Sequence, residues 1–144
     1  MPKRSGETPG RQPGHAKATP EVILDVVVGD GLCFLCVRNI SAHPAYDVRM
    51  DFDAPIIGLE GGRDLTTLPL FRHLTFLAPG REIRAFVDTS ASYFARRQPT
   101  EITVRITYRD ASNRRYVRTI RHNLEIYRHL GYVMTREAPT GGDP

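Results

Sequence analysis

The chain is poor in the residues on which covalent and metal chemistry depends. Its 144 residues include 2 Cys, 5 His and no Trp. No window approaches the run of about 18 apolar residues that a membrane-spanning helix requires. The N-terminus leads from Met1-Pro2-Lys3 into Pro and Gly instead of an apolar signal segment. We therefore expect a cytoplasmic protein with no integral membrane segment, no cofactor and no metal.

What remains is the composition of one ordinary folded domain. Apolar residues make up 40% of the chain and charged residues 25%, which excludes wholesale disorder. Residues 1–20 contain four Pro and three Gly with few aliphatic side chains, and this predicts a disordered basic tail. Residues 135–144 repeat that composition and predict a second disordered tail. The folded domain is therefore predicted over residues 21–134.

Short apolar runs are separated by turn residues about every ten positions, a spacing typical of an all-β sandwich. The runs at 22–28 and 32–37 flank Gly29-Asp30-Gly31 and predict a hairpin. The second run is apolar at both alternating positions, as expected of a central strand whose outer face is also partly covered.

Residues 46–52 and 102–108 alternate apolar with polar or charged side chains and predict two half-buried strands. The predicted buried face of the first consists of Tyr46, Val48, Met50 and Phe52. After the second, Asp110-Ala111-Ser112-Asn113 predicts a turn into a returning strand over 114–124, with Tyr108 facing Tyr116. Arg118 does not fit the alternation of that strand, which leaves a bulge or a shifted register open.

The other segments give weaker patterns. Residues 54–80 are rich in Gly and Pro and predict one or two short edge strands. A further strand is predicted to begin at Ile83, and Thr89 or Ser90 is expected to cap a short helical turn. Residues 123–130 predict a short helix that ends at a glycine.

Five short motifs follow one another along the chain: Leu35–Asn39, Pro44–Val48, Leu77–Gly80, Ile106–Asp110 and Tyr116. Their order resembles an immunoglobulin-like β-sandwich domain of uncharacterised bacterial proteins, often found behind a membrane-spanning segment. The resemblance covers about residues 32–130. It implies an antiparallel sandwich of about seven strands with short helical turns, and it implies no established biochemical role. The Pro/Gly tail stands where the anchored relatives have a hydrophobic helix.

No pattern reaches the strength of a catalytic motif. Cys33 and Cys36 have the spacing of redox and zinc sites, but residues three apart on a strand project to opposite faces. A redox pair needs a helix N-terminus and a zinc site needs further ligands, so we expect two buried, inert thiols. The chain is not predicted to be an enzyme, and an enzyme of unrecognised type is the least favoured alternative.

Charge is distributed unevenly along the sequence. Residues 21–64 contain 8 acidic residues against 3 Arg, a balance of −5, whereas residues 96–129 contain 9 Arg against 3 acidic residues, a balance of +6. The basic last hairpin would suit nucleic acid or an anionic surface. Alternatively, strands sharing one sheet would let outward carboxylates neutralise outward guanidinium groups. The carboxylates concerned are Asp47, Asp51 and Asp53, beside Arg105 and Arg109.

These observations favour a non-catalytic protein-interaction or adaptor module with one protein partner. Binding of nucleic acid or an anionic surface through the last hairpin is the alternative. The predicted partner-binding residues are Arg105, Arg109, Arg114, Arg115 and Arg121.

Overall fold

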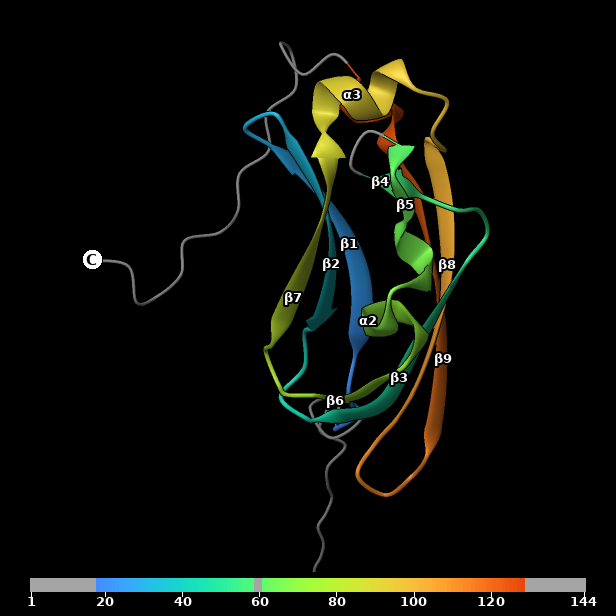
Figure 1. Cartoon of the computed structure of the whole chain (residues 1–144). Helices are drawn as coiled ribbons and strands as arrows, with labels where there is room; N and C mark the ends of the chain where they lie inside the picture. Colours follow the sequence, from blue (N-terminus) through green and yellow to red (C-terminus); the bar gives the residue numbers. More distant parts are fainter. Residues whose placement is uncertain (1–17, 59–60, 129–144) are drawn as a thin grey trace, which may run out of the picture.

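A computed structural model describes residues 18–58 and 61–128. The chain is mostly β-structure and forms two antiparallel sheets that face one another (Figure 1). One sheet has the order β1 (Val22–Gly29), β2 (Leu32–Asn39), β7 (Glu82–Thr89), and the other has the order β6 (Leu74–Leu77), β3 (Ala45–Phe52), β8 (Glu101–Arg109), β9 (Arg115–Asn123). The predicted tail over 135–144 and most of the tail over 1–20 lie outside the described residues.

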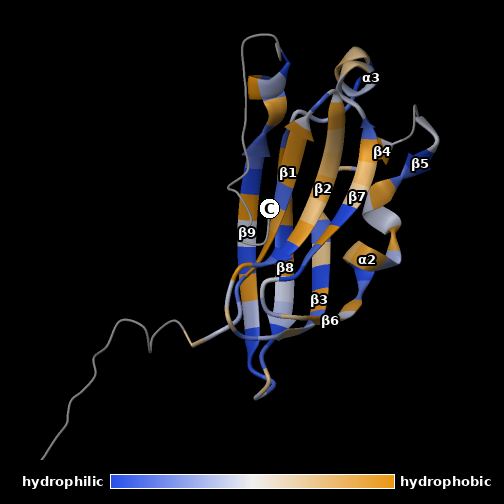
Figure 2. Cartoon of the chain, turned by 90° about the vertical axis from the view of Figure 1, so that its left-hand side faces the viewer, coloured by the Kyte–Doolittle hydropathy of each residue, from blue (hydrophilic) through white to orange (hydrophobic). Residues whose placement is uncertain are grey.

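The hairpin predicted at the start of the folded domain is present and joins β1 to β2. Asp30 and Gly31 adopt positive φ angles of 53° and 78°, the conformation that a two-residue turn with the right-handed strand twist requires. The strands it joins bury alternate side chains, among them Val22, Leu24 and Leu35, against the second sheet. β2 is the central strand of its sheet, as its apolar sequence indicated, and β1 and β2 are the most hydrophobic part of the view in Figure 2.

One side chain of β3 faces the other way from the prediction. Asp47 has a φ of 52° and sits in a β-bulge between β3 and β8. Val48 and Met50 are buried as predicted, but before the bulge Ala45 is the buried residue. Tyr46 instead packs on the exposed Phe76 of β6, with ring centroids 5.3 Å apart. Placing Tyr46 on the buried face was therefore wrong, because the extra residue of a bulge reverses the alternation.

The last hairpin has a continuous register from Glu101 opposite Asn123 to Arg109 opposite Arg115. Tyr108 faces Tyr116 as predicted, and the rings stack with centroids 5.6 Å apart. Neither a bulge nor a shifted register explains Arg118. It lies on the inner side opposite Ile106, and its Nη1 is 2.5 Å from Oε2 of Glu21. This ion pair allows an arginine to occupy a position on this edge strand where the alternation would place a core side chain.

Short elements close the sides and ends of the sandwich (Figure 1). Between β3 and β6 the chain forms β4 (Ile57–Gly58), β5 (Arg63–Asp64), the 3₁₀ helix η3 (Leu65–Thr67) and α2 (Pro69–Arg72). Phe71 of α2 is fully buried and packs on Phe52 with ring centroids 5.3 Å apart. Thus the segment predicted to supply edge strands supplies β6 as an edge strand and also seals one side of the core.

Two further helical turns lie at the end of the sandwich opposite β6 (Figure 1). The side chain of Thr89 accepts a hydrogen bond from Ser92 N and caps α3 (Ser90–Ala95), which confirms the predicted cap. The 3₁₀ helix η4 (Leu124–Tyr127) follows β9, and the glycine predicted to end it lies outside the described residues. Within residues 18–58 and 61–128, no helix has the length and apolar character needed to cross a membrane.

Candidate interaction surface

The two cysteines are separated by the sheet that carries them. Cys33 belongs to the core, whereas Cys36 lies on the outer side of β2, opposite Asp25 and Arg84. Both thiols are free and buried. Burial raises the pKa of Cys33 to about 11 and that of Cys36 to about 12, with the charge of Asp88 adding to the first and that of Glu82 to the second. Neither is a thiolate nucleophile at neutral pH, as the sequence led us to expect.

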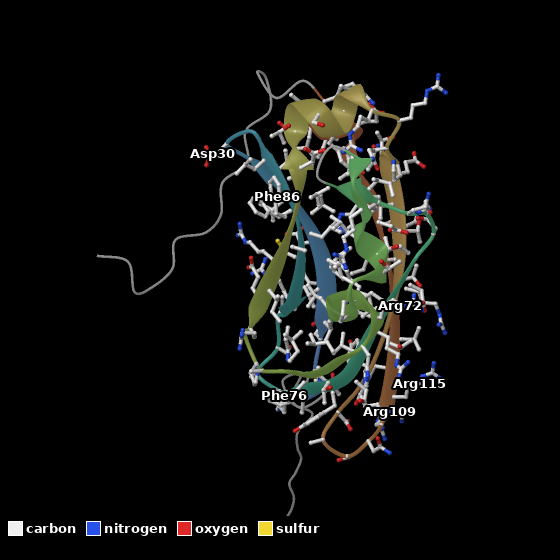
Figure 3. All side chains as sticks on the ribbon, in the orientation of Figure 1. Asp30, Arg72, Phe76, Phe86, Arg109 and Arg115 are labelled. Carbon is white, nitrogen blue, oxygen red and sulfur yellow. The ribbon has the colours of Figure 1, made fainter. Side chains whose placement is uncertain are left out.

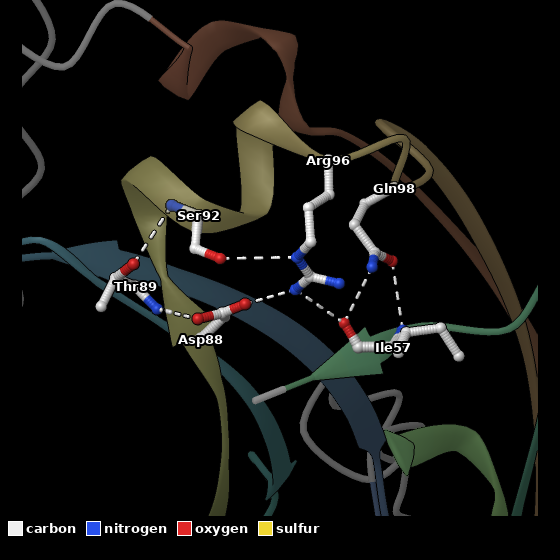
Figure 4. Close-up of polar contacts among 6 residues, drawn as sticks. All are labelled: Ile57, Asp88, Thr89, Ser92, Arg96 and Gln98. Carbon is white, nitrogen blue, oxygen red and sulfur yellow. Dashed lines mark hydrogen bonds and ion pairs between the residues drawn. The ribbon is translucent and has the colours of Figure 1, made fainter. Parts of the chain in front are cut away.

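A polar cluster near α3 contains an arginine that is already neutralised (Figure 4). The carboxylate of Asp88 accepts from Arg96 and from Thr89 N. The same guanidinium donates to Ile57 O at 3.1 Å, and the Gln98 amide bonds both Ile57 O and Ile57 N. These contacts tie β4 to the end of β7 and to α3. The cluster is a structural clamp, because its groups satisfy one another.

The outer face of the three-stranded sheet is also neutralised internally. Arg38 lies 3.9 Å from the carboxylate of Asp25 and 3.5 Å from that of Glu82. On the same face, Phe34 and Phe86 form an edge-to-face contact with ring centroids 5.7 Å apart. The Arg84 guanidinium lies 5.6 Å from the centroid of the Phe34 ring. Charges of both signs therefore cancel on this side of the molecule.

The outer face of the four-stranded sheet carries the predicted arginines. Four of them lie on it at three successive levels, since Arg105 is opposite Asp51, Arg109 is opposite Arg115, and Arg121 is opposite Thr103. Arg109 and Arg115 lie close together near the end of the hairpin (Figure 3). The strand arrangement predicted for this face is therefore present, and Asp51 is a neighbour of Arg105 as expected.

The predicted carboxylates nevertheless form no ion pairs with these arginines. Asp47 contacts His73, with its Oδ1 3.1 Å from Nε2, and Oδ1 of Asp53 accepts from Thr103 N at 3.1 Å. No salt bridge within 4.0 Å joins any arginine of this face to another described residue. The arginines concerned are Arg49, Arg105, Arg109, Arg115 and Arg121.

The turn between β8 and β9 uses its own carboxylate locally. Asp110 accepts from Arg114 N, Ser112 N and the Tyr116 hydroxyl. These hydrogen bonds, that of Arg114 N first, lower the pKa of the Asp110 carboxyl and stabilise its ionised form. Arg114 thus lies at the turn, as predicted, where its backbone helps to hold Asp110.

A hollow of about 430 Å³ opens where β3, β8 and β9 meet the residue before β6. Its wall brings the predicted Arg109 and Arg115 together with residues that sequence reasoning missed. The hollow is named here the basic hollow, and its lining consists of Asp47, Arg49, His73, Thr107, Tyr108, Arg109 and Arg115. Arg105, Arg114 and Arg121 do not line it. Arg49 was detectable as the only basic residue on the polar face of its strand, but His73 follows α2, in a segment without periodicity.

The geometry defines an antiparallel two-sheet domain with a cationic recess on one outer face. The chain belongs to the family described as domain of unknown function DUF8453, which it matches over residues 9–128. No curated protein matches it. No solved structure matches it either.

Proposed function

We propose that this chain is a non-catalytic protein-interaction module, built on an immunoglobulin-like sandwich, whose contact surface is centred on the basic hollow. The strand order supports the immunoglobulin-like assignment. The first, second and seventh strands form one sheet, and the third lies beside the eighth and ninth in the other, which corresponds to immunoglobulin strands A, B and E facing C, F and G. β6 joins β3 as the added strand of variable-type domains does.

The observation that carries the function is the pairing of Arg109 with Arg115. Two like charges directly opposite one another on an antiparallel pair are destabilising by a few tenths of a kcal/mol to about 1 kcal/mol. Here no described carboxylate relieves the repulsion, although acidic side chains lie on the neighbouring strand. A partner that brings negative charge would gain energy at this point, whereas at Arg96 it would gain none.

The surroundings of the hollow suit a protein partner. Tyr46 of β3 is the register partner of Arg109 on the neighbouring strand β8. Its ring packs on Phe76, a residue that is 49% exposed. Aromatic residues and arginine are enriched at protein interfaces, and a few such side chains carry most of the binding energy. The Tyr46–Phe76 pair next to the arginines offers apolar contact area as well as charge.

A capture experiment tests this proposal. The full chain is used as bait in a lysate of its host, and the captured protein is identified and then purified for measurement of its affinity. Exchanging both arginines, Arg109→Glu with Arg115→Glu, should weaken binding of that purified partner at least about 100-fold, since charge reversal at an interface costs several kcal/mol. Arg121→Glu is the control, because it reverses one charge on the same face of β9, and Arg115→Glu alone is the comparison that matches it in charge. Equal affinity of the double variant and the control would contradict the proposal.

Binding of nucleic acid is the second candidate function, and the unpaired Arg105 and Arg121 favour it. They extend the cationic face along β8 and β9 beyond the hollow. A polyanion would use the whole length, so Arg121→Glu would then weaken binding about as much as a change at Arg115, and affinity would fall steeply with salt. The aromatic platforms that single-stranded nucleic acid needs are not supplied by Tyr108 and Tyr116, which stack on the inner side.

A further inference from the structure

We propose that the basic hollow is an oxyanion site for a phosphoryl group, and that the partner presents this group on a phosphorylated side chain. The inference rests on the proposed function and names the chemistry by which the partner is recognised. Its elements are the guanidinium groups of Arg49, Arg109 and Arg115 and the hydroxyl of Thr107.

The charge of the lining suits a dianion. Three arginines and Asp47 give the wall a net charge of +2 when His73 is neutral. A phosphomonoester carries about −1.5 to −2 charges at pH 7 and three strong acceptor oxygens. Arginine clusters bind such groups through paired N–H donors. A single carboxylate would leave half of this charge uncompensated.

Thr107 supplies an independent observation. The residue is only 8% exposed and lines the hollow. Its hydroxyl forms no hydrogen bond with any described residue. The hydroxyl therefore has its hydrogen-bonding capacity available to a group that enters the hollow. A phosphoryl oxygen in the hollow would accept this hydrogen bond.

The wall also limits the ligand to one phosphoryl group. Asp47 lies on the side of the hollow toward β6, held at 3.1 Å by His73, and both side chains are about half exposed. A chain of phosphates that crossed the hollow would pass this carboxylate and be repelled by it. A single phosphorylated side chain that enters between Arg109 and Arg115 avoids the repulsion, while its peptide backbone remains near Tyr46 and Phe76.

The test is an NMR titration of the full chain at constant ionic strength. The probes are the peptide acetyl-Ala-Ala-phosphoserine-Ala-Ala-amide, its Asp and Ser counterparts, and inorganic phosphate. The phosphopeptide should shift the amide signals of Arg49, Thr107, Arg109 and Arg115, and it should bind at least about tenfold more tightly than the Asp peptide because of its second charge and third oxygen. The Ser peptide should cause no shift, and inorganic phosphate should compete for the same signals.

Variants make the result specific to the hollow. Arg109→Gln with Arg115→Gln should reduce phosphopeptide affinity at least about tenfold, whereas Arg121→Gln on the same face should leave it unchanged. Thr107→Val should reduce affinity several-fold and Thr107→Ser should restore it. Amide dispersion of each variant reports its fold.

Three outcomes would overturn the inference. The first is equal affinity for the Asp peptide and the phosphopeptide, and the second is binding that Arg121→Gln weakens as much as the double variant. The third is a single-stranded oligonucleotide that binds more tightly than the phosphopeptide. If the phosphopeptide fails while a captured partner still depends on Arg109 and Arg115, the proposed function stands and the phosphoryl chemistry is wrong.

Discussion

Arg96 and Arg109 carry the same guanidinium at opposite ends of one small domain and show how neighbours decide what an arginine does. At the α3 end, the side chain of Arg96 is 24% exposed and the Asp88 carboxylate beside it is 3% exposed. At the other end, Arg109 faces a second arginine, and among the residues that the structure describes it donates only to Asn113 O, at 3.3 Å. The first arginine is part of the folded framework, and the second is one that we propose to meet a partner.

The difference teaches that the number of arginines on a surface says little without their partners. Arginine is present at both ends, but the clamp around Asp88 satisfies its guanidinium with a carboxylate and a backbone carbonyl. Breaking the clamp should cost stability and leave binding intact. Changing the basic hollow should do the reverse, and weaken binding at little cost in stability.

The largest effect is expected from Arg96→Met. The change leaves the buried Asp88 carboxylate without its cation and takes one of two donors from Ile57 O, and removing one partner of a buried ion pair costs about 3–5 kcal/mol. Urea unfolding measures the loss. Arg97→Met, an exposed neighbour, should stay within about 0.5 kcal/mol of wild type. A loss at Arg96 no larger than at Arg97 would remove the distinction between the two ends.

The next effect is expected from Gly58→Ala, in the strand that the clamp holds. An added Cβ would lie 2.6 Å from Val87 O and 2.8 Å from Cδ1 of Leu65. Overpacking of this kind costs about 1–3 kcal/mol. Gly29→Ala is the matched control, because its Cβ would meet nothing within 4 Å. The midpoint of urea unfolding should fall for the first change by clearly more than for the second.

A smaller effect, an increase in stability, is expected from a change in the basic hollow. Arg115→Glu replaces a repulsive pair with an attractive one opposite Arg109 and should stabilise the fold by about 0.2–1 kcal/mol, less at high salt. Thermal unfolding at low and high ionic strength measures it. A decrease in stability at low salt would show that the two guanidinium groups do not repel one another as their register implies.

The smallest effect is expected from Asp110 and appears only in acid. Because hydrogen bonds lower its folded pKa below the usual 3.8, the stability it contributes is fully present above that value and is lost as the pH falls through the folded pKa. Asp110→Asn removes the titration, so wild type should lose more stability than the variant between pH 5 and pH 2. Urea unfolding at both pH values gives the comparison, and parallel losses would contradict it.

Particular residues show which features of the fold could be predicted from the sequence. The hairpins, the alternation of 102–108 and the pairing of Tyr108 with Tyr116 were predictable, because strand periodicity and turn chemistry are local properties. Tyr46 was misplaced because nothing in the sequence marks Asp47 as the bulged residue. The ion pair of Arg118 with Glu21 was not visible either, since these residues are 97 positions apart.

The sequence by itself determined that this protein is a β-domain with an uneven charge distribution and two cysteines on opposite faces of one strand, because the order of side chains along each strand fixes which of them share a face. Only the tertiary structure decided which arginines remain unneutralised. Asp88 meets Arg96, Asp47 meets His73, and Arg109 meets Arg115 through the packing and register of separate elements. The energy of a charge depends on what lies within a few ångströms of it, and the fold sets those distances.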